Sequence, residues 1–262
     1  MPRADDGKRL DAGALHGATI VITRPVGTGA SLARAVRDAG GDALLVPGLR
    51  LRACADAQVR AVANACDPWV FTSPAAARFA FEAGLRPKRR RVAVIAVGEG
   101  TRAALARRGL PAVAPSGRGD SEALLALPAL SDVRDRRIAL FGAAGGRDVI
   151  APGLRARGAV VEVVHVYERL RPRLTRRHVD AIAGAREPLV MLVSSGEVLA
   201  NLAAGLPSPA LQRLRSAHVV ASSARVAALA RAHGFADIYV AESALPRDLL
   251  AAAAQWLARH RS

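Results

Sequence analysis

Short apolar runs alternate with amphipathic segments along nearly the whole chain. The runs have the length of β-strands, and those at 92–97 and 189–193 lack polar alternation, as strands buried on both faces do. Strands that alternate with helices predict parallel sheets with crossover helices, and therefore an α/β fold. The expected strands are 19–25, 43–46, 69–71, 92–97, 112–114, 137–141, 160–166, 189–193 and 218–221.

Glycines mark where several of the expected helices end. Gly40, Gly109, Gly158 and Gly234 each directly follow an amphipathic segment, and a glycine in the left-handed conformation is a common helix C-cap. The expected helices are 31–39, 75–82, 147–157, 197–204 and 248–259, with one more ending at Gly109 and one at Gly234.

The chain is also similar to itself. Three segments of the first half recur in the same order in the second half, at nearly constant offsets. One shared helix pattern could arise by chance, but three in order indicate two similar α/β domains. The matching pairs are Gly40 with Gly158 at an offset of 118, Ser73 with Ser195 at an offset of 122, and segment 92–109 with segment 218–234.

The composition is strongly basic, with a formal net charge of +16, and all but two of the 38 basic residues are arginines. Such a charge attracts polyanions, which include nucleic acid, an acidic membrane face and a polycarboxylate substrate. A coding bias toward alanine and arginine is an equally good explanation of the overall charge. The arginines are scattered except at 88–91 and are not interleaved with aromatic residues, which counts against single-strand nucleic-acid binding.

Several further classes are disfavoured by the sequence. Cys54 and Cys66 are the only cysteines, they form no CxxC pair, and no Cys/His cluster has the spacing of metal ligands. Residues 1–15 are polar and are expected to form a disordered leader rather than a signal peptide. No apolar run approaches the roughly 20 residues of a membrane span. We therefore expect a soluble cytoplasmic protein without a bound metal.

Small and hydroxyl-bearing residues cluster where the expected strands end. In open α/β sheets the carboxyl ends of the strands form the edge at which ligands bind. Helix N-termini at that edge offer free N–H groups and a partial positive charge to an anion. Ordinary N-capping is the better explanation of any single motif, but six motifs at the same kind of edge favour anion binding. The motifs are 23–25, 72–74, 98–101, 142–146, 194–196 and 222–223.

Segment 98–103 also fits the weak dinucleotide-binding pattern G-x-G-x-x-A. That interpretation needs an acidic residue at the end of the next strand. The next expected strand ends at Pro115, and Asp120 lies in a glycine-rich loop. A nicotinamide site is therefore disfavoured.

Tyr167 is the most interesting titratable residue. It lies two residues after His165 in an expected strand, so the two side chains are expected to share one face. A phenol can donate or accept a proton and can hydrogen-bond a leaving oxygen. Packing between domains is the alternative role.

Taken in order, these motifs resemble the uroporphyrinogen-III synthase family. The resemblance runs from about Thr19 to Trp256 and depends on the order and spacing of motifs that are individually loose. The motifs are Ile22-Thr23-Arg24-Pro25, Phe71-Thr72-Ser73-Pro74, residues 96–101, Arg157-Gly158-Ala159, Val166-Tyr167-Glu168-Arg169, Val193-Ser194-Ser195-Gly196 and Ala221-Ser222-Ser223.

The resemblance implies two flavodoxin-like parallel-sheet domains joined by a two-stranded linker, with a discontinuous first domain. Domain 1 would comprise 17–47 and 168–262, domain 2 would comprise 51–164, and the linker strands would be about 46–50 and 164–168. The family is mostly monomeric.

The implied reaction closes hydroxymethylbilane to uroporphyrinogen III in the interdomain cleft, with loss of water, inversion of the last pyrrole and no cofactor. By resemblance Tyr167 assists departure of the hydroxyl, Thr101 lies at the cleft, and Ser73 and Ser195 are paired strand-end serines. Family members often carry Asn or Arg where this chain has Ala75. The candidate substrate-binding residues are Arg24, Ser73, Gly98, Gly100, Thr101, Gly142, Ser194, Ser195 and Ser222.

Two other classes stay open at this point. A non-catalytic two-lobed anion-binding protein would share the anion-binding edges but would have no need of a proton donor at Tyr167. A nucleic-acid binder would concentrate its arginines on one face and would show a steep salt dependence of binding.

Overall fold

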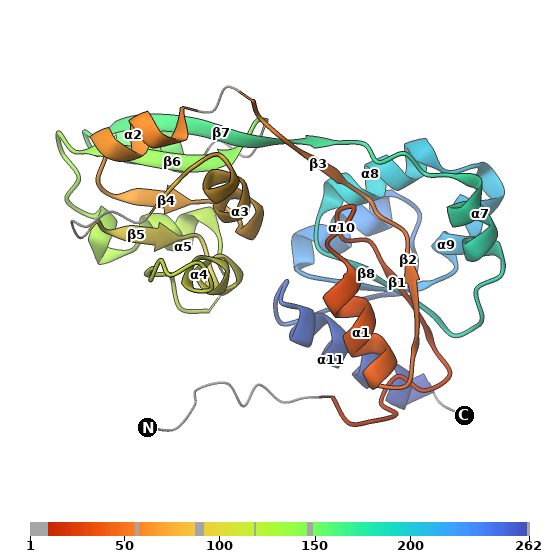
Figure 1. Ribbon diagram of the computed structural model, residues 1–262. Coiled ribbons are helices and arrows are strands. Elements are labelled where there is room, and N and C mark those ends of the chain that lie inside the picture. Colours follow the sequence, from red (N-terminus) through yellow and green to blue (C-terminus); the bar gives the residue numbers. More distant parts are fainter. Residues whose placement is uncertain (1–9, 56–57, 87–91, 118, 146–148, 261–262) are drawn as a thin grey trace. The chain divides into compact units, whose positions relative to one another are not determined.

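The computed structural model describes residues 10–55, 58–86, 92–117, 119–145 and 149–260 (Figure 1). The chain divides into two compact units, the first made of the residues up to Arg50 and from Leu170, the second of Leu51–Arg169. The chain crosses between the units within strand β3 (Arg50–Ala53) and at the end of strand β7 (Val160–Leu170).

Unit 1 holds a five-stranded sheet with the order β10-β9-β8-β1-β2, in which every neighbouring pair is parallel. Its strands are β1 (Thr19–Ile22), β2 (Asp42–Leu45), β8 (Leu189–Val193), β9 (His218–Ala221) and β10 (Ile238–Val240). Its helices are α1 (Ala30–Asp38), α7 (Arg176–Ala183), α8 (Gly196–Gly205), α9 (Ser208–Arg215), α10 (Ala224–Ala232) and α11 (Pro246–His260).

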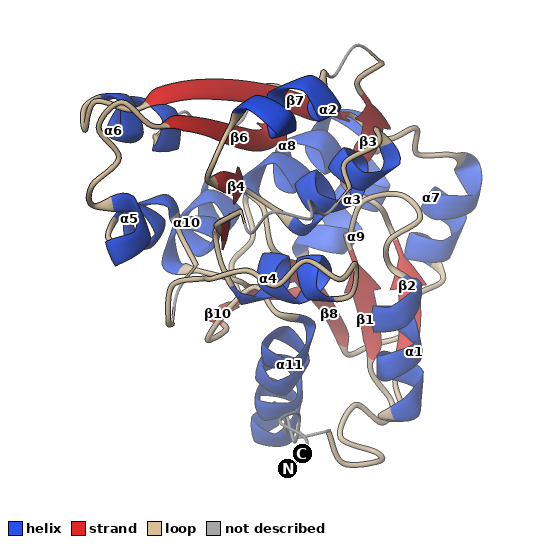
Figure 2. Cartoon of the chain, turned by 60° about the vertical axis from the view of Figure 1, so that its left-hand side comes forward, coloured by secondary structure: helices blue, strands red, loops and turns tan. Residues whose placement is uncertain are grey.

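Helices cover both faces of this sheet (Figure 2). Helices α1 and α11 pack on one face, where Ile20, Ile22 and Val190 point. Helices α7, α8, α9 and α10 pack on the other face, where Val21 and Met191 point. Alternate strand residues therefore enter two cores, which explains why the strands read as continuous apolar runs.

Unit 2 is built on the same plan around a sheet with the order β3-β7-β6-β4-β5. Strands β4, β5, β6 and β7 are parallel. Its other strands are β4 (Trp69–Phe71), β5 (Val94–Ala96) and β6 (Arg137–Ala143). Its helices are α2 (Val59–Ala65), α3 (Pro74–Glu82), α4 (Glu99–Ala106), α5 (Ser121–Leu125), the 3-10 turn η1 (Pro128–Leu130) and α6 (Ile150–Arg155).

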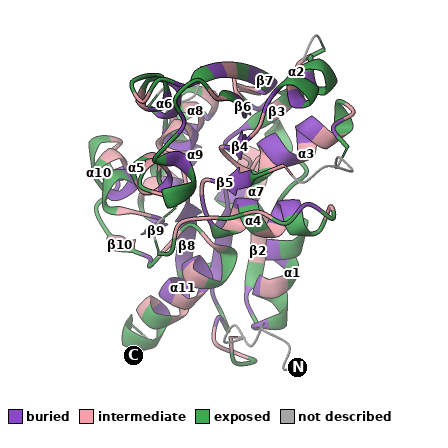
Figure 3. Cartoon of the chain, turned by 90° about the vertical axis from the view of Figure 1, so that its left-hand side faces the viewer, coloured by how far each residue is buried: buried purple, intermediate pink, exposed green. Residues whose placement is uncertain are grey.

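The two cores of unit 2 also lie on opposite faces of its sheet. Helices α2, α3 and α4 cover Trp69, Phe71 and Phe141. Helices α5 and α6 with η1 cover Val70 and Ile138 on the other face. Figure 3 shows the buried residues concentrated in the strands and on the inward faces of the helices. An α/β fold with two predominantly parallel sheets is thus confirmed.

The internal similarity seen in the sequence appears as matching strand order. The strands β2, β1, β8 and β9 of unit 1 correspond, in their order across the sheet, to β7, β6, β4 and β5 of unit 2. In the place of β10, unit 2 has a single parallel bridge between Ile95 and Val113. The four glycines expected to end helices all have positive φ, between 72° and 86°. Most expected strands and helices match within about two residues, the usual uncertainty of element ends.

Three expectations about local structure are wrong. Leu15 is fully buried in the core of unit 1, so order begins before the end of the leader expected at 1–15, of which 1–9 lie outside the described residues. The helix expected at 147–157 begins only at Ile150, because Pro152 is tolerated in a first turn but not inside a helix; residues 146–148 are not described. Gly142 lies inside β6 rather than in a turn.

Most of the residues expected to form linker strands belong to the units themselves. Val46 and Leu49 are buried in a core of unit 1, and a Cβ on Gly48 would approach Val198 Cγ1 to 2.3 Å. Val164 and Val166 are buried in a core of unit 2. Their apolar side chains gain more from burial than a solvent-exposed linker would give them.

Candidate functional site

The strands of unit 1 end side by side. Ile22 pairs with Leu192, and Val193 pairs with Ala221, so the residues that follow these strands meet at one edge of the sheet. The Thr23 hydroxyl donates to the Leu192 carbonyl at 2.7 Å. The edge motifs containing Thr23, Ser194 and Ser222 are therefore brought together by register.

Helix starts at this edge follow the expected pattern in two of three cases. Ser195 is the N-cap of α8, and its side chain makes no capping hydrogen bond. Ser223 is the N-cap of α10 and accepts from the Val226 N–H at 3.3 Å, whereas its neighbour Ser222 is buried. Helix α1 begins only at Ala30, so segment 23–25 leads into a turn and does not open a helix.

Arg24 carries the most distinctive charge at this edge. Its side chain is half-buried, and Nη2 donates to the Ala244 carbonyl at 3.2 Å. Among the described residues Arg24 has no carboxylate partner. Burial lowers the pKa of the Arg24 guanidinium, because a desolvated cation is less stable than a hydrated one. A guanidinium has five N–H donors, so several remain available to an anion.

At the corresponding edge of unit 2 the Ser73 hydroxyl meets the Tyr167 phenol. Their oxygens are 3.0 Å apart. Ser73 is also the N-cap of α3, where its Oγ accepts from the Ala76 N–H at 2.9 Å. The Tyr167 ring is 5% exposed and stacks on Phe79 of the same helix, with centroids 5.2 Å apart and planes 17° apart. Helix α3 thus holds the phenol through both its ring and its oxygen.

A β-bulge aims Tyr167 at Ser73. Gly142 pairs with His165 and Ala143 pairs with Tyr167, so Val166 is an extra residue in β7. A bulge turns the following side chain to the other face of the strand. His165 is exposed whereas Tyr167 is buried with Val164 and Val166. The expectation that His165 and Tyr167 share a face is therefore wrong.

The start of α4 is packed tightly by a loop. Gly98 is the N-cap of α4. A Cβ on Gly119 would lie 2.6 Å from Gly98 Cα and 2.8 Å from the Val97 carbonyl oxygen. Gly100 lies half-buried in the first turn of α4, and Thr101 is 2% exposed. The Thr101 side chain therefore faces the protein in this structure.

The other sequence candidates have structural explanations. A Cβ on Gly142 would lie 3.0 Å from Thr72 Oγ1, so this glycine permits close packing of β6 against β4. Asp120 is the N-cap of α5 and accepts from the Ala123 N–H at 2.8 Å. A cap role accounts for Asp120 without a dinucleotide.

We expect Gly119→Ala to disturb the start of α4. The new methyl group would meet backbone atoms of Val97 and Gly98, which cannot yield as a side chain can. The loop must shift, and we expect a loss of stability of about 1–3 kcal/mol, as for overpacked sites. Chemical denaturation measures this change. Gly109→Ala is a matched loop-glycine control without neighbours within 4 Å; because Gly109 has a φ of 72°, it reports strain without a clash. A Gly119→Ala stability equal to wild type would contradict the tight contact.

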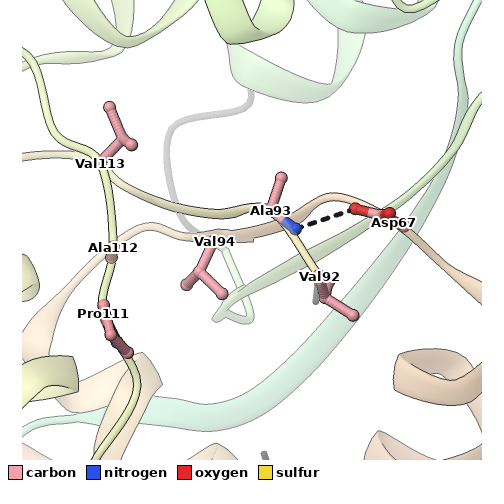
Figure 4. Close-up of a pocket in the computed structure, with 7 residues that line it drawn as sticks. All are labelled: Asp67, Val92, Ala93, Val94, Pro111, Ala112 and Val113. Atoms are coloured by element: carbon pink, nitrogen blue, oxygen red, sulfur yellow. Dashed lines mark hydrogen bonds between the residues drawn. The ribbon is translucent and has the colours of Figure 1, made fainter. Parts of the chain in front are cut away.

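A separate cavity lies away from these residues. It has a volume of about 480 Å³ and lies in unit 2 at the amino-terminal ends of β4 and β5. Figure 4 shows the residues that line it. That edge is opposite the one carrying Ser73 and Gly98. The described part of the chain also contains no group of three His, Cys, Asp or Glu side chains placed to hold a metal. The lining residues are Asp67, Val92, Ala93, Val94, Pro111, Ala112 and Val113.

Some residues of the site could not be identified from the sequence. Phe79 stacks on Tyr167, and Ala244 binds Arg24, with no motif to mark either. Arg52 and Glu168 form an ion pair between β3 and β7 next to Tyr167, and the Arg52 hydrogen bond lowers the pKa of Glu168. Two of these residues carried a sequence signal, because Glu168 lies in the motif 166–169 and Gly119 lies in a glycine-rich loop.

None of the helices in the described ranges is long and apolar enough to cross a bilayer.

The chain is 34% identical over 131 residues to uroporphyrinogen-III synthase of Escherichia coli, and the match covers 50% of this chain and 53% of that protein. It is 44% identical over 50 residues to the Proteus mirabilis enzyme of that name, covering 19% of this chain and 25% of that protein. The chain thus matches about half the length of the first of these curated relatives.

Solved structures share the fold over nearly the whole chain. A mutant uroporphyrinogen III synthase of Thermus thermophilus superposes with a TM-score of 0.61 at 23% identity, covering 93% of this chain and 100% of that one. The Helicobacter pylori uroporphyrinogen-III synthetase gives 0.62 at 12% identity, covering 92% and 100%. The family model described as uroporphyrinogen-III synthase HemD matches residues 30–251, and the chain belongs to that family.

Proposed function

We propose that this protein closes hydroxymethylbilane to uroporphyrinogen III, with inversion of the last pyrrole and loss of water. Family membership supports the reaction. The main structural support for a catalytic role is the position of Tyr167. This residue is 5% exposed, and its phenol is hydrogen-bonded to Ser73 where the strands of the sheet end. A phenol held in this way can act as a general acid.

The substrate carries eight carboxylates, and the strand-end edges offer donors for them. Arg24 supplies a guanidinium without a carboxylate partner among the described residues. The helices that begin at Ser73, Gly98, Ser195 and Ser223 supply backbone N–H groups, and helix N-termini favour anions. We propose that these groups bind the bilane and hold it in the folded shape that ring closure requires.

In the proposed reaction the protein donates one proton, to the hydroxyl that leaves. The nitrogen of the pyrrole that bears the hydroxymethyl group pushes its electron pair toward the leaving hydroxyl. Tyr167 would donate a proton to that oxygen, which leaves as water. Ring closure later releases a proton from the pyrrole carbon that forms the new bond. One proton is therefore consumed and one released, and Tyr167 can be protonated again.

We also propose that both units are flavodoxin-like. The order of unit 1, renumbered within that unit, is 2-1-3-4-5, the order of flavodoxin. Unit 2 would be a permuted version, in which β6 and β7 take the first two places. That the substrate lies in a cleft between the domains, that the protein is a cytoplasmic monomer and that it binds no nucleic acid stay predictions.

The decisive experiment supplies fresh hydroxymethylbilane and separates the uroporphyrinogen isomers by chromatography after oxidation. Uncatalysed closure gives the symmetric type I isomer. We expect the protein to give type III at a rate above the spontaneous reaction. Type I at the spontaneous rate, with the bilane still bound, would favour the non-catalytic anion-binding protein and contradict the proposal.

A further inference from the structure

We propose that Ser73 is a positioning residue that holds Tyr167 with its proton directed away from Ser73 and toward the substrate. This inference rests on the proposed function, because it assigns the Ser73 hydroxyl a task in the same proton transfer. It replaces the simpler view in which Ser73 contacts only substrate. The inference is based on the 3.0 Å hydrogen bond between the Ser73 and Tyr167 hydroxyl oxygens.

Either hydroxyl could be the donor in this bond, and the two directions have different chemical consequences. If Tyr167 donates to Ser73, its proton is already engaged. If Ser73 donates to Tyr167, the phenolic proton can point elsewhere while the oxygen stays fixed. A hydroxyl has one donor and two acceptor positions. Ser73 already fills one acceptor position with the Ala76 N–H at 2.9 Å, and its own proton remains to be given.

The position of Ser73 at the start of α3 favours donation toward Tyr167. Helix α3 runs from Pro74 to Glu82, and Pro74 at its first position has no N–H. The Ala76 N–H that Ser73 accepts belongs to the positive end of the helix. A hydroxyl that accepts from such a donor becomes a better donor itself, because hydrogen bonds in a chain polarise one another. The order is then Ala76 N–H, Ser73 O–H, Tyr167 O–H, substrate.

The phenol has little freedom to turn away from this arrangement. Its ring stacks on Phe79 with planes 17° apart, and Phe79 lies on the helix that Ser73 begins. The bulge at Val166 places the ring on this face of β7. Ring and oxygen are therefore both positioned by α3, and rotation of the O–H bond is the remaining degree of freedom. Ser73 controls that rotation.

The same contact would serve the state that follows proton transfer. The Tyr167 O–H bond breaks as the C–O bond of the hydroxymethyl group breaks, and water leaves. The methylene carbon that loses the hydroxyl forms a double bond to the ring carbon that bears it, and the pyrrole nitrogen forms a double bond to the other ring carbon bonded to it. The phenolate that remains accepts the Ser73 hydrogen bond at once, without reorientation. A hydrogen bond to a charged acceptor is stronger than one to a neutral acceptor, so Ser73 contributes more in the transition state than in the ground state.

The test compares Ser73→Gly and Ser73→Thr with wild type by steady-state kinetics on fresh hydroxymethylbilane. Glycine is accepted at an N-cap and lacks the hydroxyl, so the helix survives. We expect Ser73→Gly to lower kcat about tenfold with KM within about twofold, and Ser73→Thr to restore most of kcat. In a Tyr167→Phe background Ser73→Gly should have no further effect.

Ser223→Gly is the matched control for the fold. Ser223 has the same backbone conformation as Ser73, with φ −166° and ψ 161°, and caps α10 in the same way, but it has no tyrosine partner among the described residues. Both glycine variants should lower the thermal midpoint by similar amounts.

Three outcomes would overturn the inference: a raised KM with unchanged kcat, an effect that persists in Tyr167→Phe, or no rescue by threonine. Failure of wild type to form the type III isomer would instead overturn the proposed function.

Discussion

Tyr167→Phe is expected to lower kcat for type III formation by about 10- to 1000-fold, within or below the range for loss of one positioned acid. The substitution removes only the phenolic oxygen, and phenylalanine keeps the ring that stacks on Phe79. Ser73 loses one partner but keeps its capping bond to Ala76. The fold should therefore survive, with KM nearly unchanged. Steady-state kinetics and thermal unfolding of the same preparation measure both.

The second tyrosine of the chain is the control. The Tyr239 hydroxyl is bonded to Gln255 Oε1 at 3.1 Å on an exposed surface, in β10 of the other unit. Tyr239→Phe should leave kcat and KM as in wild type. If Tyr167→Phe and Tyr239→Phe both react at the wild-type rate, Tyr167 has no part in the chemistry and packing alone explains its burial.

Much of this arrangement can be predicted from the sequence because it depends on local patterns. An apolar run followed by Thr-Ser-Pro predicts a strand end and an N-cap, and β4 indeed ends at Phe71 while Ser73 is the N-cap of α3. A glycine after an amphipathic segment predicts a left-handed helix end, as at Gly40 and Gly158. Parallel strands then bring such strand ends to one edge without any further information.

What could not be predicted depends on register between distant segments. Regular alternation along β7 places His165 and Tyr167 on one face, and only the pairing of Ala143 with Tyr167 reveals that Val166 is bulged out of register. The extra residue lets Val164, Val166 and Tyr167 all enter one core. A strand pattern read without its partner strand contains no sign of that choice, since burial is decided jointly by both.

The charge environment of Arg24 is a second feature that could not be predicted from the sequence. The sequence offers 38 basic residues and does not distinguish those with a carboxylate partner from those without. Arg137 is exposed and pairs with Glu162 at 2.8 Å, whereas half-buried Arg24 reaches only the Ala244 carbonyl within the described ranges. A partly desolvated cation without a counter-ion costs stability. This cost is offset when an anion binds, which is the role that we propose for Arg24.

Arg24→Gln is accordingly expected to raise KM for hydroxymethylbilane by about 10- to 100-fold, the loss of a hydrogen bond between charged groups. Glutamine can still donate to Ala244, so the loop contact has a replacement. The free energy of unfolding should stay equal or rise, because the pKa of Arg24, lowered by burial, reports a charge that the fold stabilises poorly. A residue needed only for structure would show the reverse, a loss of stability with KM unchanged.

Arg137→Gln is the matched control, since it removes the same charge from the amino-terminal end of β6. If the general positive field of the protein attracts the substrate, both variants should raise KM alike, and both effects should vanish as salt is added. If Arg24 binds one carboxylate directly, only Arg24→Gln should raise KM, and part of the difference should persist at high salt, because a half-buried pair is screened less than a surface one. Equal KM values for the two variants at every salt concentration would rule out a direct contact at Arg24.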